Sequence, residues 1–131
     1  MRQPVPAILR RASWLTGAAG ASAVLLGAFG AHALRGVLDP PGRELWHTAT
    51  QYHFWHALAL AAACLAPAGR ARRTALIAFA AGIVLFCGSL YALDLGAPRW
   101  CGAITPLGGV AFIVGWLALG VALRREDKPA S

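Results

Sequence analysis

Charged residues divide the chain into long apolar blocks. Four blocks contain no Asp, Glu, Lys or Arg, and each is at least 20 residues long: residues 12–34, 46–69, 74–93 and 100–123. A helix of about 20 predominantly apolar residues is long enough to cross the hydrocarbon core of a bilayer. The pattern therefore predicts four transmembrane helices, at about residues 13–34, 46–66, 74–93 and 103–123.

Proline and glycine mark the connections between these helices. The segment Asp39-Pro40-Pro41-Gly42 cannot continue the first helix, because consecutive prolines fix the backbone and lack amide donors. Pro67 and Gly69 end the second helix in the same way. Trp46 follows the first connection, and we expect it in the aromatic belt at the membrane surface.

The fourth block contains Pro106, which predicts a kink near Gly108-Gly109. Its missing amide proton would also leave a carbonyl that a neighbouring group must satisfy within lipid. With short connections, consecutive helices should lie antiparallel to one another. We therefore predict an all-α fold, in which residues 1–131 form a single transmembrane domain, a compact antiparallel four-helix bundle.

Composition agrees with a membrane protein. The chain is 58% hydrophobic and 13% charged, against about 25% charged residues in an average soluble domain. This excludes a soluble enzyme and a disordered tail. Cys64, Cys87 and Cys101 show no paired or CxxC spacing, which argues against a disulfide framework and a zinc site.

Lys and Arg gather at the ends of the apolar blocks. If the chain crosses four times, the N-terminus, the loop at residues 70–73 and the C-terminus share one side, which holds nine of the twelve basic residues. The positive-inside rule then places both termini in the cytoplasm. The formal charge of +7 has no aromatic-interleaved basic stripe beside it, so we expect a lipid bilayer as partner and no nucleic acid.

The first apolar block has some features of a signal peptide. Arg10 and Arg11 precede it, and Ala31-His32-Ala33 resembles a cleavage site. Its uncharged stretch is longer than the 7–15 residues of a usual signal-peptide core. We therefore expect this segment to be a retained first helix.

Polar side chains within the blocks concentrate toward the outer half of the membrane. His56 lies ten residues after Trp46, about 15 Å along the helix, near the middle of the bilayer. Polar groups buried in a membrane are costly and often mark a functional site. The candidate residues for a ligand site or hydrogen-bond network are His32, Gln51, Tyr52, His53, His56, Ser89, Tyr91, Asp94, Thr105 and Pro106.

Several interpretations of this cluster remain open from the residues alone. It can be an interhelical hydrogen-bond network, or a metal or haem site that uses His32, His53 and His56. It can also belong to a proton or solute pathway, although no Asp or Glu lies deep in a helix. No nucleophile–base pair, HExxH motif or phosphate-binding loop indicates an enzyme.

Four motifs resemble those of a known family. They are Gly27-Ala28-Phe29-Gly30-Ala31-His32-Ala33-Leu34, Thr48-Ala49-Thr50-Gln51-Tyr52-His53 with His56-Ala57-Leu58-Ala59-Leu60, Phe86-Cys87-Gly88-Ser89-Leu90-Tyr91, and Ile104-Thr105-Pro106-Leu107-Gly108-Gly109. The chain is identified by them as a member of the domain-of-unknown-function 423 family of YgdD-like bacterial inner-membrane proteins. Transmembrane protein 256 of animals is similar to this family.

The resemblance implies a multi-pass protein with four helices in the bacterial inner membrane. It implies no activity, ligand or catalytic residue, and in the family the position of His53 is often Gln. We expect a non-enzymatic protein without a cofactor, whose polar cluster stabilises the bundle or binds a small ligand or partner. The alternatives are a small transporter or channel-like protein acting as an oligomer, and a metal- or haem-binding membrane protein. A homo-oligomer or a membrane-protein partner is compatible with each.

Overall fold

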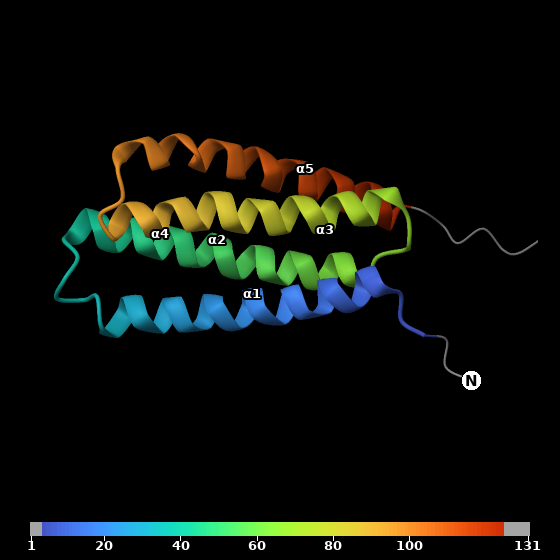
Figure 1. The fold of residues 1–131 in the computed structure, drawn as a ribbon, viewed down its shortest axis with the longest axis horizontal. Coiled ribbons are helices and arrows are strands. Elements are labelled where there is room, and N and C mark those ends of the chain that lie inside the picture. The colour runs from blue at the N-terminus through green and yellow to red at the C-terminus, as the bar shows by residue number, and fades with distance from the viewer. Residues whose placement is uncertain (1–3, 125–131) are drawn as a thin grey trace, which may run out of the picture.

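The computed structural model describes residues 4–124, and its elements in that range are helical (Figure 1). α1 spans Ala7–His32 and α2 spans Pro40–Leu65. The chain turns between them at residues 33–39. The all-α fold class predicted from the sequence is confirmed.

The second half of the chain forms two further rods. α3, Arg70–Gly82, continues through a π-helical segment, Ile83–Cys87, into α4, Gly88–Asp94. These three elements form one rod in Figure 1. A 3-10 turn at residues 99–103 then leads into α5, Thr105–Leu123.

α2 begins six residues before the predicted start of the second helix. Asp39 is its N-cap, and the carboxylate accepts a hydrogen bond of 2.9 Å from the amide of Gly42. Pro40 and Pro41 occupy the first helical positions, where an amide proton would have no intrahelical partner. The prolines therefore end α1 as predicted, but they also start α2.

Trp46, which we expect in the aromatic belt at the membrane surface, packs against α1 inside the protein. Because α2 begins at Pro40, Trp46 lies well inside the helix and is 4% exposed. Its indole N–H donates to the carbonyl of Leu26 on α1 at 2.9 Å. Gly30 leaves the space for its ring, since a Cβ there would collide with the indole.

Pro106 does not interrupt a helix, which corrects a second prediction. α5 begins at Thr105, so Pro106 lies in its first turn, where helical amides have no intrahelical acceptor. The missing amide proton therefore breaks no hydrogen bond. The reason for expecting a kink near Gly108 disappears, and α5 is one uninterrupted α-helix.

The four rods form an open row. α1 packs along α2, α2 along the rod of α3 and α4, and that rod along α5 (Figure 1). Within the described chain, α1 makes no extensive contact with α5, and α2 touches α5 only slightly. In a closed bundle the first and last helices would also pack together. The arrangement is therefore more open than the compact bundle predicted.

Glycines allow the rod of α3 to approach α5 closely. The ring of Phe112 lies over Gly82, and the ring of Phe79 lies over Gly115. Gly108 lies directly against the backbone of Phe86. Small residues permit such approach of helices in membranes, where packing replaces the hydrophobic drive between them. These contacts draw α5 toward α3 and leave it apart from α2.

Three helical rods among residues 4–124 are long and apolar enough to cross a membrane: Ala7–His32, Arg70–Asp94 and Arg99–Leu123. α2 is not among them, because it carries more polar residues than any of the other rods. It nevertheless lies between the other rods along its length (Figure 1). The buried polar residues of α2, His53 and His56, therefore need partners within the protein.

Candidate functional site

His53 and His56 lie on α2 and are both 4% exposed. They are three positions apart, so their side chains leave the helix about 60° from each other. His56 faces α5, whereas His53 faces α1 and α4. The two imidazoles therefore belong to two different hydrogen-bond groups.

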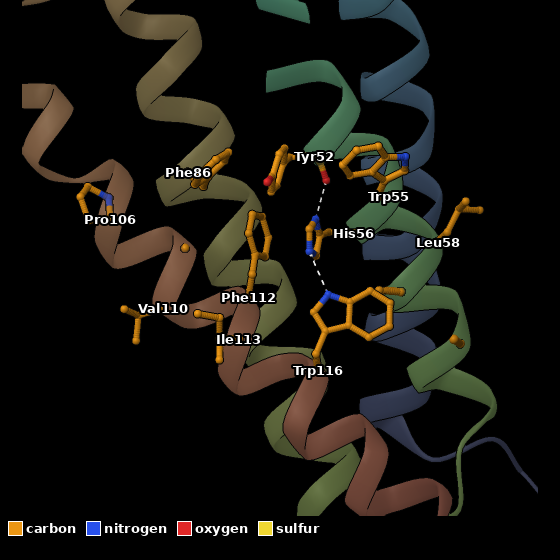
Figure 2. Close-up of a pocket in the computed structure, with 13 residues that line it drawn as sticks. Tyr52, Trp55, His56, Leu58, Phe86, Pro106, Val110, Phe112, Ile113 and Trp116 are labelled. Carbon is orange, nitrogen blue, oxygen red and sulfur yellow. Dashed lines mark hydrogen bonds between the residues drawn. The ribbon is translucent and has the colours of Figure 1, made fainter. Parts of the chain in front are cut away.

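His56 links α2 to α5. Its Nδ1–H donates to the carbonyl of Tyr52 at 2.6 Å, and its Nε2 accepts from the indole N–H of Trp116 at 3.1 Å (Figure 2). The imidazole also stacks on Phe112, with ring centroids 3.5 Å apart and planes 11° from parallel. Both ring nitrogens are thus engaged in the neutral tautomer.

His53 links α2 to α1 and α4. Its Nε2 lies 3.1 Å from Ser22 Oγ, and its Nδ1 lies 3.0 Å from the hydroxyl of Tyr91. Ser22 Oγ also donates to the carbonyl of Ala19 at 3.1 Å. All three groups are satisfied when Nε2–H donates to Ser22 and the Tyr91 hydroxyl donates to Nδ1.

A third polar contact joins α4 to the start of α5. Ser89 is buried and donates through Oγ to the carbonyl of Phe86 at 2.9 Å. The hydroxyl of Thr105 then donates to Ser89 Oγ at 2.6 Å. We call the three groups around His53, His56 and Ser89 the polar network, and its members are Ser22, Tyr52, His53, His56, Ser89, Tyr91, Thr105 and Trp116.

Other predicted site residues lie outside the polar network. His32 is exposed at the end of α1, and Gln51 is exposed on α2. Asp94 ends α4 near the first turn of α2, and its Oδ1 lies close to Gly42. Its Oδ2 is buried without a hydrogen-bond partner among residues 4–124. Pro106 makes no polar contact and lines a groove instead.

The histidines proposed as metal ligands do not converge. His32 is exposed, and His53 and His56 bond to different helices. Within the part of the chain that the structure describes, no three His, Cys, Asp or Glu side chains are placed to share a metal ion. The geometry of this site therefore favours a hydrogen-bond network over metal ligation.

A lateral groove of about 890 Å³ lies between α2 and α5, which we call the α2–α5 groove (Figure 2). It exists because the backbone of α5 packs on α3, so that α5 meets α2 mainly through side chains such as His56, Phe112 and Trp116. Its lining is mainly apolar, and the rings of Tyr52, Phe86 and Phe112 lie together at one side. His56 is also part of the lining. Concave, mostly apolar sites with few polar groups are typical of small-molecule binding.

Sequence reasoning missed three residues that complete the site. Ser22 and Trp116 lie in blocks whose other members are almost all apolar, so neither shows a polar pattern. Phe112 reads as an ordinary lipid-facing side chain. No local pattern could pair Ser22 with His53 or Trp116 with His56, because these contacts join positions 31 and 60 residues apart.

Comparison with known proteins connects this chain to membrane proteins of bacteria. Residues 26–109, which include all ten candidate residues, match the model of a family described as protein of unknown function, DUF423. The chain is 48% identical over 105 residues to UPF0382 membrane protein YwdK of Bacillus subtilis, covering 76% of this chain and 85% of that protein.

A second relative comes from another bacterium. Over 115 residues the chain is 37% identical to UPF0382 inner membrane protein YgdD of Escherichia coli, covering 82% of this chain and 86% of that protein. The names of both relatives describe membrane proteins and mention no catalytic activity. No solved structure matches the chain.

Proposed function

The chain belongs to the DUF423 family of membrane proteins of unknown function, and on this premise we propose that it is a non-enzymatic, multi-pass protein of the bacterial inner membrane whose polar network holds α2 among the other helices. The observation that carries the proposal is that both imidazoles are fully hydrogen-bonded. All four ring nitrogens of His53 and His56 have partners within the protein.

The low hydropathy of α2 explains why such a network is needed. A polar group that faces hydrocarbon without a hydrogen-bond partner costs roughly several kcal/mol. In the described structure His53 bonds to α1 and α4, and His56 bonds to α5. We infer that these contacts let α2 cross the bilayer as a fourth helix, antiparallel to its neighbours.

The arrangement of charges supports a topology with both termini in the cytoplasm. The described basic residues Arg10, Arg11, Arg70, Arg72, Arg73 and Arg124 lie at one end of the rods, and Arg35, Arg43 and Arg99 lie at the other. Arg2, Arg125 and Lys128, which also enter the count from the sequence, lie outside the described residues.

The engaged imidazoles weigh against the alternatives of a metal site and a proton pathway. A metal ligand must offer a free ring nitrogen, and a relay needs a group that exchanges partners. A small ligand in the α2–α5 groove is still compatible with this geometry, because that groove is open and aromatic-lined. Binding there would leave the hydrogen bonds of His56 in place.

The test compares His56→Leu with His47→Leu. His47 is an exposed residue on the same helix, so both variants remove one imidazole and add one apolar side chain. The free energy of unfolding in detergent is measured by denaturant titration. We expect His56→Leu to lose about 1–3 kcal/mol, because it leaves the part-buried indole N–H of Trp116 without an acceptor, and His47→Leu to lose less than about 0.5 kcal/mol.

A double-mutant cycle with Trp116→Phe isolates the interhelical bond. If the network is structural, His56→Leu should cost less in the Trp116→Phe background, because the donor is already absent. Interhelical hydrogen bonds in membranes contribute about 0.6 kcal/mol on average and up to about 1.7 kcal/mol. Equal stability of His56→Leu and the unmodified protein would contradict the network and favour a ligand role for His56.

A further inference from the structure

A second groove follows the opposite side of α2, between α1 and the rod of α3 and α4. It consists of two adjoining hollows of about 550 and 510 Å³. The hollows share Leu15, Ala80 and Val84 in their linings, so they form one continuous channel along the surface. We call it the α1–α3 groove. It exists because α1 packs on α2 and leaves α3 uncovered on that face.

The α1–α3 groove is long and apolar. It follows α1 from Ile8 to Leu26, a rise of about 27 Å at 1.5 Å per residue. The hydrocarbon core is roughly 30 Å thick, so an acyl chain from one leaflet would occupy about half of the groove. The polar side chains His53, Ser22 and Tyr91 close one end, where they bond to one another. The shape fits an extended hydrocarbon chain.

Cationic side chains lie at the other end of the groove. Arg11 is part of its lining. Arg73 lies one turn before Ile77 on the same face of α3, because residues four apart stack along a helix. The described carboxylates of Asp39, Glu44 and Asp94 all lie at the opposite end of the molecule.

We propose that the α1–α3 groove binds one acyl chain of an anionic phospholipid, with the lipid phosphate held by Arg11 and Arg73. Charge decides between the possible occupants. A second copy of this chain would bring the same arginines to the same end, whereas an anionic headgroup would neutralise them. Basic pockets between transmembrane helices are known to suit anionic headgroups. The inference requires insertion in a membrane and does not depend on the role of the polar network.

The experiment measures lipid binding by native mass spectrometry. The detergent-purified, delipidated full chain is mixed with phosphatidylglycerol or with phosphatidylethanolamine of identical acyl chains. We expect phosphatidylglycerol to bind at least about five-fold more strongly, since one basic residue near an anionic lipid contributes about this factor. Equal binding of the two lipids would overturn the proposal.

Neighbouring arginines supply a matched pair of variants. Arg11→Gln and Arg10→Gln remove the same charge at adjacent positions, but Arg11 lines the groove and Arg10 does not. We expect Arg11→Gln to weaken phosphatidylglycerol binding about five-fold. Arg10→Gln should change it less than about two-fold, because the loss of one of several positive charges reduces the non-specific attraction to an anionic lipid only slightly. Equal losses would show non-specific attraction and contradict a site.

A third variant tests the acyl chain. Val84 lines both hollows and is 70% exposed, so Val84→Trp should fold while it fills the middle of the groove. We expect it to reduce phosphatidylglycerol binding, and Val110→Trp in the α2–α5 groove to leave that binding unchanged. Unchanged binding by Val84→Trp would overturn the proposal. The proposal would also be overturned if the mass spectrum of the unmodified protein showed a dimer that Val84→Trp abolishes, because a second copy of the chain would then occupy the groove.

Discussion

His53 and His56 show how a difference of three positions separates two chemical environments. One imidazole bonds to α1 and α4, and the other bonds to α5. The same separation holds for Phe86 and Cys87, which are consecutive in the π-helical segment yet line opposite grooves. Residues near each other in the chain therefore need not serve one site. Close packing at single glycines decides where the rods meet.

Gly108 and Gly109 provide a test at the scale of one residue. A Cβ on Gly108 would collide with the backbone of Phe86, whereas a Cβ on Gly109 would meet Phe86 Cδ2 at an ordinary 3.9 Å. We expect Gly108→Ala to lower the free energy of unfolding by about 1–3 kcal/mol through overpacking. Gly109→Ala should be neutral or stabilising by up to about 1 kcal/mol, because alanine favours helix.

Denaturant titration in detergent measures both glycine variants under one set of conditions. The comparison controls for helix propensity, because the two positions are adjacent on α5 and the substitution is the same. A loss of equal size in both variants would show that the close approach at Gly108 is not what holds α5 to the rod of α3.

At the scale of an element, α2 combines a well-capped N-terminus with an unusually polar first half. Its N-cap carboxylate and two N-terminal prolines define the beginning. The polar side chains that follow lower its hydropathy relative to the other rods. Helix ends that face a membrane surface still leave amides that need acceptors. The cap therefore contributes stability that the composition of the helix does not supply.

Asp39→Ala tests that contribution. Removal of the carboxylate leaves the amide of Gly42 without its 2.9 Å acceptor, and we expect a loss of about 0.5–2 kcal/mol in the free energy of unfolding. Asp39→Asn should retain most of the stability, since an amide oxygen also caps a helix. Glu44→Gln removes one negative charge from the same helix end without removing the cap. Identical losses for Asp39→Ala and Glu44→Gln would point to charge alone.

At the scale of the whole molecule, the open row of rods creates two grooves on opposite sides of α2. The α2–α5 groove contains His56, and the α1–α3 groove ends at His53. A closed bundle of the same helices would have covered both grooves. Each imidazole therefore lies between a hydrogen-bond partner and a surface that membrane components can reach.

Membrane topology is the prediction that belongs to this scale. We expect alkaline phosphatase, which is active only outside the cytoplasm, to be active when fused after Gly36 or Gly96 and inactive when fused after Ala68. Nine of the twelve basic residues would then lie inside, in agreement with the positive-inside rule. Fluorescent-protein fusions at the same positions should give the complementary pattern. The same result at Gly36 and Ala68 would mean that α2 does not cross.

Helix content and the location of polar residues were predictable from local sequence. Blocks of 20 or more uncharged residues gave the rods, because backbone groups in lipid must bond within a helix. Among the candidate residues, His53, His56, Ser89, Tyr91 and Thr105 make interhelical or local hydrogen bonds in the structure, as polar side chains in such blocks need partners. The start of α2 was missed because two prolines can begin a helix as readily as end one.

The sequence by itself determined the all-α class, the apolar rods and the residue types available for a polar network. Only the tertiary structure decided which partners these residues have. The absence of a Cβ at Gly108 and Gly82 lets Phe86 and Phe112 pack there and brings α5 onto α3, and the bond from Trp116 then orients His56. Such contacts depend on the relative positions of helices far apart in the chain, and local hydropathy contains no information about those positions.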